Sequence, residues 1–133
     1  MTSLRLASTL PPDVEDLARQ TIGAMLDVHR ELGSGMSEAV YVSAIRIELA
    51  ARCISFESEK MLPVRYRGHL LGYHRVDLVV AERLVVEIKS VEALHPVHVA
   101  QVVTYLRLTG ARLGLLVNFN VALLKEGIRR VIR

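Results

Sequence analysis

The sequence has little of what many small proteins use for stability. Its 133 residues include one cysteine, no tryptophan and 5% aromatic residues. A single cysteine, Cys53, excludes an internal disulfide and a cysteine-rich zinc site, so nothing requires an oxidising compartment. We expect Cys53 to serve in helix packing. A chain of this length buries roughly two-thirds of the surface that its unfolded form exposes, so its core needs no disulfide or structural metal.

Long apolar runs are also missing. No stretch approaches the roughly 18 apolar residues of a membrane span, and residues 1–12 lack the apolar run of a signal peptide. We therefore expect a cytoplasmic protein without membrane contact, with a flexible N-terminal segment over 1–12 and a single domain over 13–133. There is no Walker-type glycine-rich loop. His74 and His95 belong to no metal-binding pattern and are interpreted as surface residues.

The formal net charge of +3 conceals an uneven distribution. Residues 1–59 carry five Lys/Arg and nine Asp/Glu, whereas residues 60–133 carry twelve and five, so the halves have net charges of −4 and +7. A basic half of this kind favours a polyanionic partner such as nucleic acid. Scattered, solvated arginines would give the same count.

Apolar spacing and turn residues predict mixed α and β structure. Ser37 is the expected N-cap of the second helix, Pro63 indicates an edge strand or bulge, and Thr109-Gly110 ends the last helix. The order ααβββαβ plus a short C-terminal tail predicts an α/β (α+β) domain with a small mixed sheet flanked by helices. The expected helices cover 13–32, 37–51 and 96–108; an extended segment covers 54–67; strands cover 74–80, 84–90 and 112–118; and the tail, 121–133, holds a short helical turn and a strand from Ile128.

The hairpin around residues 81–83 brings two carboxylates together. If its turn is centred on Glu82, one face is apolar, and a slip of one residue would expose that face. Side chains directly opposite one another have Cβ atoms about 4.5–5.5 Å apart. The resulting pairs are Val76–Ile88, Leu78–Val86 and Val80–Leu84 on the apolar face, and Asp77–Glu87, Arg75–Lys89 and Val79–Val85 on the other.

Two facing carboxylates destabilise a sheet unless positive charge intervenes. Mg²⁺ supplies that charge, because it takes oxygen ligands and is commonly held by one or two carboxylates. Lys89 projects from the same face as Glu87 and could activate a water and stabilise charge on a phosphate. An ordinary solvated face carrying two acids and a lysine is the alternative, although Val79 and Val85 indicate that this face is partly covered.

The residues of this hairpin, together with further motifs, resemble the PD-(D/E)XK nuclease superfamily. The closer resemblance is to its small GxxExxY proteins, whose motif stands here as Gly35 to Tyr41. Val76 replaces the proline of the superfamily's name, while the aspartate is retained. The other matching pieces are Arg75-Val76-Asp77-Leu78, Val86-Glu87-Ile88-Lys89-Ser90, residues 101–106 and residues 114–120, so that the resemblance covers about residues 14–131.

The resemblance implies a restriction-endonuclease-like core and a catalytic metal site. Asp77 and Glu87 would be metal ligands, with the backbone carbonyl of Ile88 as a third, and Lys89 would be the catalytic lysine. Glu38 would be the additional acid, which reaches the metal directly or through water. The implied cofactor is Mg²⁺, with Mn²⁺ as a substitute.

A Gln-x-x-x-Tyr motif on the third helix completes the resemblance. Gln101 and Tyr105 would support the site or contact substrate, and their spacing puts both on one helix face with His98. The residues outside the hairpin could instead have purely structural roles. Glu38 would also suit the first turn of a helix, and Tyr41 and Tyr105 would also suit the core with satisfied hydroxyls.

Together these features predict a Mg²⁺-dependent nuclease that hydrolyses phosphodiester bonds, with DNA as its substrate. The alternative is a non-catalytic nucleic-acid- or protein-binding module that retains the nuclease fold, because the chain has no large basic cluster and few aromatics to stack on bases. A homodimer formed through the apolar N-terminal helices is compatible with either function.

Overall fold

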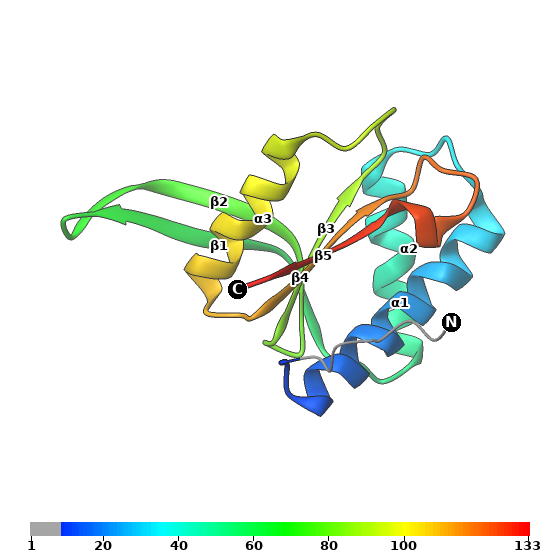
Figure 1. Ribbon diagram of the computed structural model, residues 1–133, viewed down its shortest axis with the longest axis horizontal. Coiled ribbons are helices and arrows are strands. Elements are labelled where there is room, and N and C mark those ends of the chain that lie inside the picture. Colours follow the sequence, from blue (N-terminus) through cyan, green and yellow to red (C-terminus); the bar gives the residue numbers. More distant parts are fainter. Residues whose placement is uncertain (1–8) are drawn as a thin grey trace, which may run out of the picture.

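The elements of the computed structural model, which describes residues 9–133, follow the predicted order (Figure 1). Residues 1–8 of the segment predicted to be flexible lie outside the described residues. The elements are α1 (Pro12–Leu32), α2 (Glu38–Ala51), β1 (Phe56–Tyr66), β2 (His69–Val80), β3 (Leu84–Lys89), α3 (Pro96–Thr109), β4 (Leu113–Asn118), the 3₁₀ turn η1 (Leu124–Gly127) and β5 (Ile128–Ile132).

The helix ends follow local sequence signals. Ser37 caps α2, its hydroxyl accepting a hydrogen bond from the Val40 amide at 3.4 Å. Gly110 ends α3 in the left-handed conformation, with φ of 76°, and donates its amide to the Leu106 carbonyl at 2.9 Å. The predicted helix boundaries are therefore confirmed to within one or two residues.

The strands form one mixed sheet in the order β1-β2-β3-β4-β5. Only β3 and β4 run parallel, and α3 is the crossover that a parallel pair requires. The predicted tail pairs as β5 with β4, at the edge opposite β1. On the other edge, β1 contains Pro63 and a bulge between Val64 and Arg65, as the proline indicated.

Helices cover both faces of the sheet. One apolar cluster packs α1 and α2 against residues such as Leu78, Val86 and Leu115, and a second packs α3 against residues such as Val79 and Val85. Figure 1 shows α1 and α2 together on one side of the sheet and α3 on the other. The predicted α+β domain, a small mixed sheet flanked by helices, is confirmed. No helix in residues 9–133 has the length and apolar composition to cross a bilayer.

The expectation for Cys53 was wrong. Its side chain is exposed, and the residue has a φ of 57° in the turn that follows α2. Cys53 adopts the left-handed conformation that ends α2, with its amide bonded to the Ala50 carbonyl at 3.0 Å, and this change of backbone direction takes its side chain off the packed face of α2.

Candidate active site

The β2–β3 hairpin has the predicted register near its turn. The ladder pairs Val80 with Leu84, Val79 with Val85 and Leu78 with Val86, and there the regular pairing ends. Beyond Leu78 the hydrogen-bond acceptor is a side chain instead of a main-chain carbonyl. The Ile88 amide donates to Asp77 Oδ2 at 2.8 Å. The predicted ladder pairs beyond Leu78 are therefore absent, and a gap holding the Asp77 carboxylate opens between the two strands.

The apolar face of β2 also changes at Asp77. Leu78 and Val80 belong to the cluster under α1 and α2, whereas Val76 belongs to the cluster under α3. The expectation that Val76 shares a face with Leu78 was therefore wrong. In the paired strand β1, Glu59 has a φ of 52°, an irregularity that breaks the alternation of side chains opposite Asp77.

Glu87 on β3 is the most perturbed carboxylate of the site. It is 5% exposed, and its Oε2 has no hydrogen-bond partner among the described residues. Burial, and after it the adjacent Asp77 carboxyl group, raise its pKa to about 9, and the charge of Lys89 offsets only part of this rise. Asp77 and Glu87 therefore lie together, as predicted, and without a cation Glu87 keeps its proton at neutral pH.

Two further predicted groups lie on β3 next to Glu87. Because the amide and carbonyl of one strand residue point the same way, the Ile88 carbonyl lies on the side of β3 that faces Asp77. Lys89 is half-buried and ends the strand, and Phe119 donates its amide to the Lys89 carbonyl at 2.9 Å. The backbone of Lys89 is thus fixed by the end of β4.

The Gly35–Tyr41 motif holds the start of α2 against the end of β3. Gly35 has a φ of 97°, which glycine adopts without a steric penalty. The buried Tyr41 donates its hydroxyl to the Gly33 carbonyl at 2.5 Å and accepts the Met36 amide at 3.1 Å. Its role in the described structure is thus that of a core aromatic with a satisfied hydroxyl.

The exposed Glu38 is tied to the same junction. Its Oε1 accepts the Ser90 amide at 3.3 Å, and the Ser90 hydroxyl donates to the Met36 carbonyl at 2.8 Å. The charge of Glu38 also contributes to the raised pKa of Glu87. Glu38 therefore lies beside the two central carboxylates, bonded to the backbone that follows Lys89.

Gln101 and Tyr105 approach from α3. Burial and the nearby charges of Glu87 and Asp77 raise the pKa of Tyr105 to about 12, and the side chains of Gln101 and Glu87 lie beside its hydroxyl. Nearby, His98 accepts the His95 amide at Nδ1 at 3.0 Å and so caps α3. The pKa of His98 is lowered by partial burial and by the charge of Lys89. All predicted site residues thus converge at one end of β3.

An open cleft of about 240 Å³ lies beside Asp77, between α2 and the β1–β2 hairpin. Arg46 and Arg75 line it, and sequence reasoning did not assign either of them to the site. A signal was available for both. Arg46 follows Glu38 by eight residues on α2, which returns it to the same helix face, and Arg75 precedes Asp77 by two on β2. The cleft is also lined by Ala39, Val42, Ser43 and Glu59.

The donor set of the site fits a hard divalent cation. The buried, unpartnered oxygen of Glu87, the Asp77 carboxylate and the Ile88 carbonyl are all oxygen ligands of the kind that Mg²⁺ takes. Within residues 9–133, no three His, Cys, Asp or Glu side chains are grouped to hold a metal by themselves. A metal here would depend on two carboxylates, a main-chain carbonyl and water.

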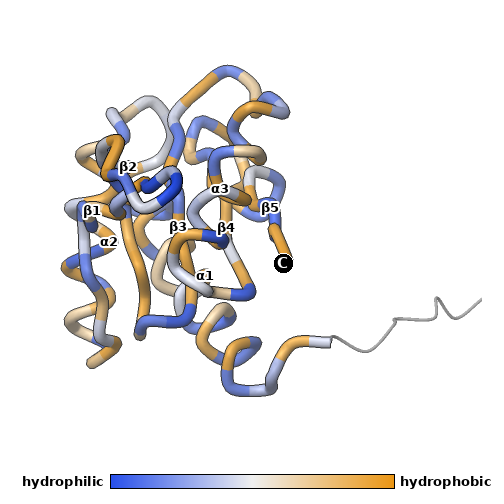
Figure 2. Tube along the Cα trace, turned by 90° about the vertical axis from the view of Figure 1, so that its left-hand side faces the viewer, coloured by the Kyte–Doolittle hydropathy of each residue, from blue (hydrophilic) through white to orange (hydrophobic). Residues whose placement is uncertain are grey.

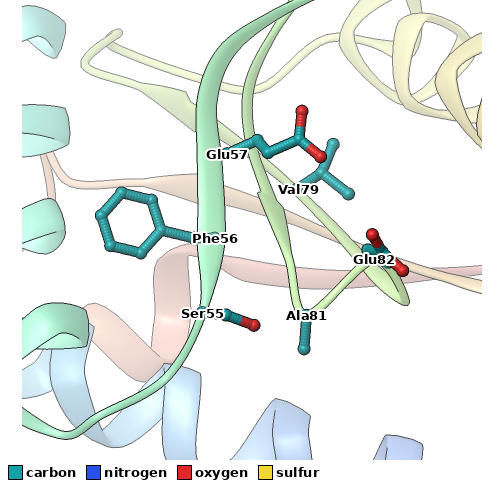
Figure 3. A pocket seen from close by; sticks show the side chains of 6 residues that line it. All are labelled: Ser55, Phe56, Glu57, Val79, Ala81 and Glu82. Carbon is teal, nitrogen blue, oxygen red and sulfur yellow. The ribbon is translucent and has the colours of Figure 1, made fainter.

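A separate pocket lies at the turn end of the hairpin (Figure 3). In Figure 3 the carboxylates of Glu57 and Glu82 lie on the same side as Val79, while Phe56 points away from them. The lining contains two acids and no lysine or arginine, so it does not suit a phosphate group. The remaining lining residues are Ser55 and Ala81.

Comparison with known proteins agrees with the geometry. The model of the PD-(D/E)XK nuclease superfamily matches residues 15–131, nearly all of the described structure. The chain belongs to the PD-(D/E)XK nuclease superfamily. No curated protein and no solved structure matches it. Nucleases of this superfamily generally use divalent metal ions, and the paired acids of β2 and β3 are consistent with that chemistry.

Proposed function

We propose that the protein is a Mg²⁺-dependent nuclease that hydrolyses DNA phosphodiester bonds, with Mn²⁺ as a substitute ion. The observation that carries this proposal is the buried Glu87 carboxylate beside Asp77, with one oxygen unpartnered. Without a cation, burial and the neighbouring acid hold Glu87 protonated at neutral pH. A divalent cation would stabilise both carboxylates in their charged form.

Asp77, Glu87 and the Ile88 carbonyl would hold the ion, and Glu38 would reach it through water. When bound, Mg²⁺ would activate an attacking water and stabilise charge on the phosphate. Lys89 supplies an ammonium group at the end of β3, where it orients the attacking water and stabilises developing negative charge. Tyr105, with Gln101 beside its hydroxyl, lies against Glu87 from α3 and supports the position of that side chain.

The cleft holds two arginines among its acids, and one of them, Arg75, lies 3.8 Å from Glu59. Arg46 and Arg75 line it beside Asp77, from α2 and β2. Guanidinium groups bind phosphate with paired N–H donors, so these two arginines suit the phosphates next to the scissile bond. This arrangement leaves acids for the metal at the centre and cations for the polymer at the sides.

The test is a cleavage panel on linear, circular, single-stranded and duplex DNA and on RNA, with Mg²⁺, Mn²⁺ or chelator. Asp77→Asn, Glu87→Gln and Lys89→Ala should each abolish cleavage, whereas the exposed carboxylate variant Glu126→Gln should keep it. Intact metal-dependent cleavage in Glu87→Ala/Lys89→Ala would overturn the assignment.

Calorimetric titration with Mg²⁺ separates this function from that of a non-catalytic module. A nuclease should bind the ion, and Glu87→Gln should weaken that binding. Tight nucleic-acid binding without metal binding or cleavage would identify a scaffold that retains only the fold.

A further inference from the structure

The distal part of the β1–β2 hairpin, residues 60–76, projects from the body of the molecule and is here called the arm (Figure 1). Strand β3 pairs with β2 only at residues 78–80, and β1 is an edge strand, so within residues 9–133 neither side of the arm is paired with another strand. At its base, Leu62 is buried in the cluster under α3, and the His74 ring lies 6.0 Å from the Tyr105 ring.

The arm carries charge of one sign. Residues 60–76 contain four Lys/Arg, two His and no Asp or Glu. Lys60 and Arg75 are paired with Glu57 and Glu59 at the base of the arm, whereas Arg65 and Arg67 have no ion pair among the described residues. At the tip, Arg67 lies 5.5 Å over the Tyr66 ring in the turn that joins β1 to β2. Figure 2 views the molecule from the side on which the arm projects, and the turn at its tip is hydrophilic. A surface of this composition attracts a polyanion.

One face of the arm continues the proposed active site. His74 faces α3, so its neighbours Arg75 and Tyr73 face the other way, towards the cleft that Asp77 and Arg75 line. Arg75 has a side chain that is 62% exposed and lies 3.8 Å from the equally exposed Glu59, and Tyr73 is 57% exposed. A polymer whose phosphate lies at Asp77 would therefore continue along Arg75 and Tyr73 towards the tip.

The shape of the arm selects among polyanions. From Leu62 to Tyr66 the strand takes four steps, about 13 Å at the usual rise per residue. The major groove of B-form DNA is about 12 Å wide and 8.5 Å deep and admits a two-stranded ribbon. The major groove of an RNA duplex is too deep and narrow for side chains to read.

A second copy of this chain is a poorer occupant. Pro63 lacks an amide on the free edge of β1, and the bulge at Val64/Arg65 interrupts the strand, which both oppose edge-to-edge pairing. Two arms placed side by side would also bring arginines together without an acid between them.

We infer that the arm grips duplex DNA, inserting its tip into the major groove while a phosphate lies at Asp77. The inference rests on the proposed nuclease function for the position of that phosphate. It names the substrate class as duplex DNA and assigns Arg65 and Arg67 to phosphate contacts and Arg75 to the path between the tip and the cleft.

The test compares two double variants that remove equal charge. R65Q/R67Q changes the arm, and K125Q/R129Q removes two exposed cations near the opposite edge of the sheet. Binding to labelled duplex DNA, to an RNA duplex of the same sequence and to the single strand is measured by fluorescence anisotropy in chelator, between about 0.05 and 0.2 M salt.

We expect R65Q/R67Q to weaken duplex DNA binding about tenfold at 0.1 M salt and to reduce the slope of log K against log salt by about 1.8, or 0.9 per lost contact. K125Q/R129Q should leave both quantities near their wild-type values. Wild type should prefer duplex DNA to the RNA duplex and to the single strand.

Equal effects of the two variants would overturn the inference, as would equal affinity for the three polymers. A larger loss of single-strand than of duplex binding in Tyr66→Ala/Tyr73→Ala would instead make the arm a base-stacking platform. If Asp77→Asn still cleaves while R65Q/R67Q weakens duplex DNA binding as expected, the nuclease site is wrongly assigned and the role of the arm stands. If wild type shows metal-dependent cleavage and R65Q/R67Q binds duplex DNA as wild type does, the inference about the arm is wrong and the nuclease function stands.

Discussion

Replacing Glu87 by glutamine should stabilise the metal-free protein, and increasingly so as the pH rises. Burial and the contact with Asp77 raise the Glu87 pKa from 4.5 to about 9. Below about pH 4.5 the folded and unfolded chains both hold the proton, so the titration of Glu87 does not change stability there. Between the two pKa values only the folded chain retains it, so the unfolded chain is progressively favoured.

The size of the effect follows from the shift. Each pKa unit corresponds to about 1.4 kcal/mol, so the ionisation of Glu87 should lower stability by about 3 kcal/mol at pH 7 and about 6 kcal/mol at pH 9 and above. Glutamine has nearly the same shape and does not titrate. The free energy of unfolding of Glu87→Gln should therefore exceed that of wild type by an amount that grows by about 4 kcal/mol from pH 5 to pH 8.

Urea denaturation in chelator across this pH range measures the difference. Glu126→Gln, which neutralises an exposed acid in η1, is the matched control and should follow wild type. Adding Mg²⁺ should stabilise wild type and have less effect on Glu87→Gln, because only the native state holds the ion. A difference between Glu87→Gln and wild type that stays constant from pH 5 to pH 8 would refute the reasoning.

Three further results are expected. Glu87 must lose its proton to bind a cation, so Mg²⁺ binding to wild type at pH 7 should release about one proton and Mg²⁺ binding to Glu87→Gln should release none. Calorimetry in two buffers of different ionisation enthalpy measures the number of protons released. Tyr41→Phe removes the hydroxyl that bridges Gly33 and Met36 and should lower stability by about 1–3 kcal/mol in urea denaturation; an unchanged midpoint would show that this bridge is unimportant. The buried Asn118 side chain forms hydrogen bonds with both the amide and the carbonyl of Val91. Asn118→Ala should therefore lower stability by about 2–3 kcal/mol and reduce the protection of the Val91 amide in hydrogen exchange. Unaltered protection would contradict this role.

The sequence predicted most of the fold because its signals were local. Ser37, Gly110 and Pro63 each act within a few residues, and the alternation around Glu82 fixed the hairpin register as far as Leu78 and Val86. The proximity of Asp77 and Glu87 followed from that register.

What the sequence did not predict depends on departures from regular geometry. The positive φ of Glu59 and the hydrogen bond from Ile88 to Asp77 together end the ladder and move Val76 to the other face. An alternation argument assumes a regular strand, so it passes over such a break. The cleft between Arg46 and Arg75 likewise depends on how α2 packs against the hairpin, which periodicity does not report.

Cleavage of duplex DNA is the most direct test of the central claim, that the acids of β2 and β3 form a metal-dependent nuclease site. Wild type should cut with Mg²⁺ and stop with chelator, and Asp77→Asn and Glu87→Gln should be inactive while correctly folded and while binding duplex DNA. Equal cleavage by wild type and Glu87→Gln, or cleavage that persists in chelator, would contradict the account.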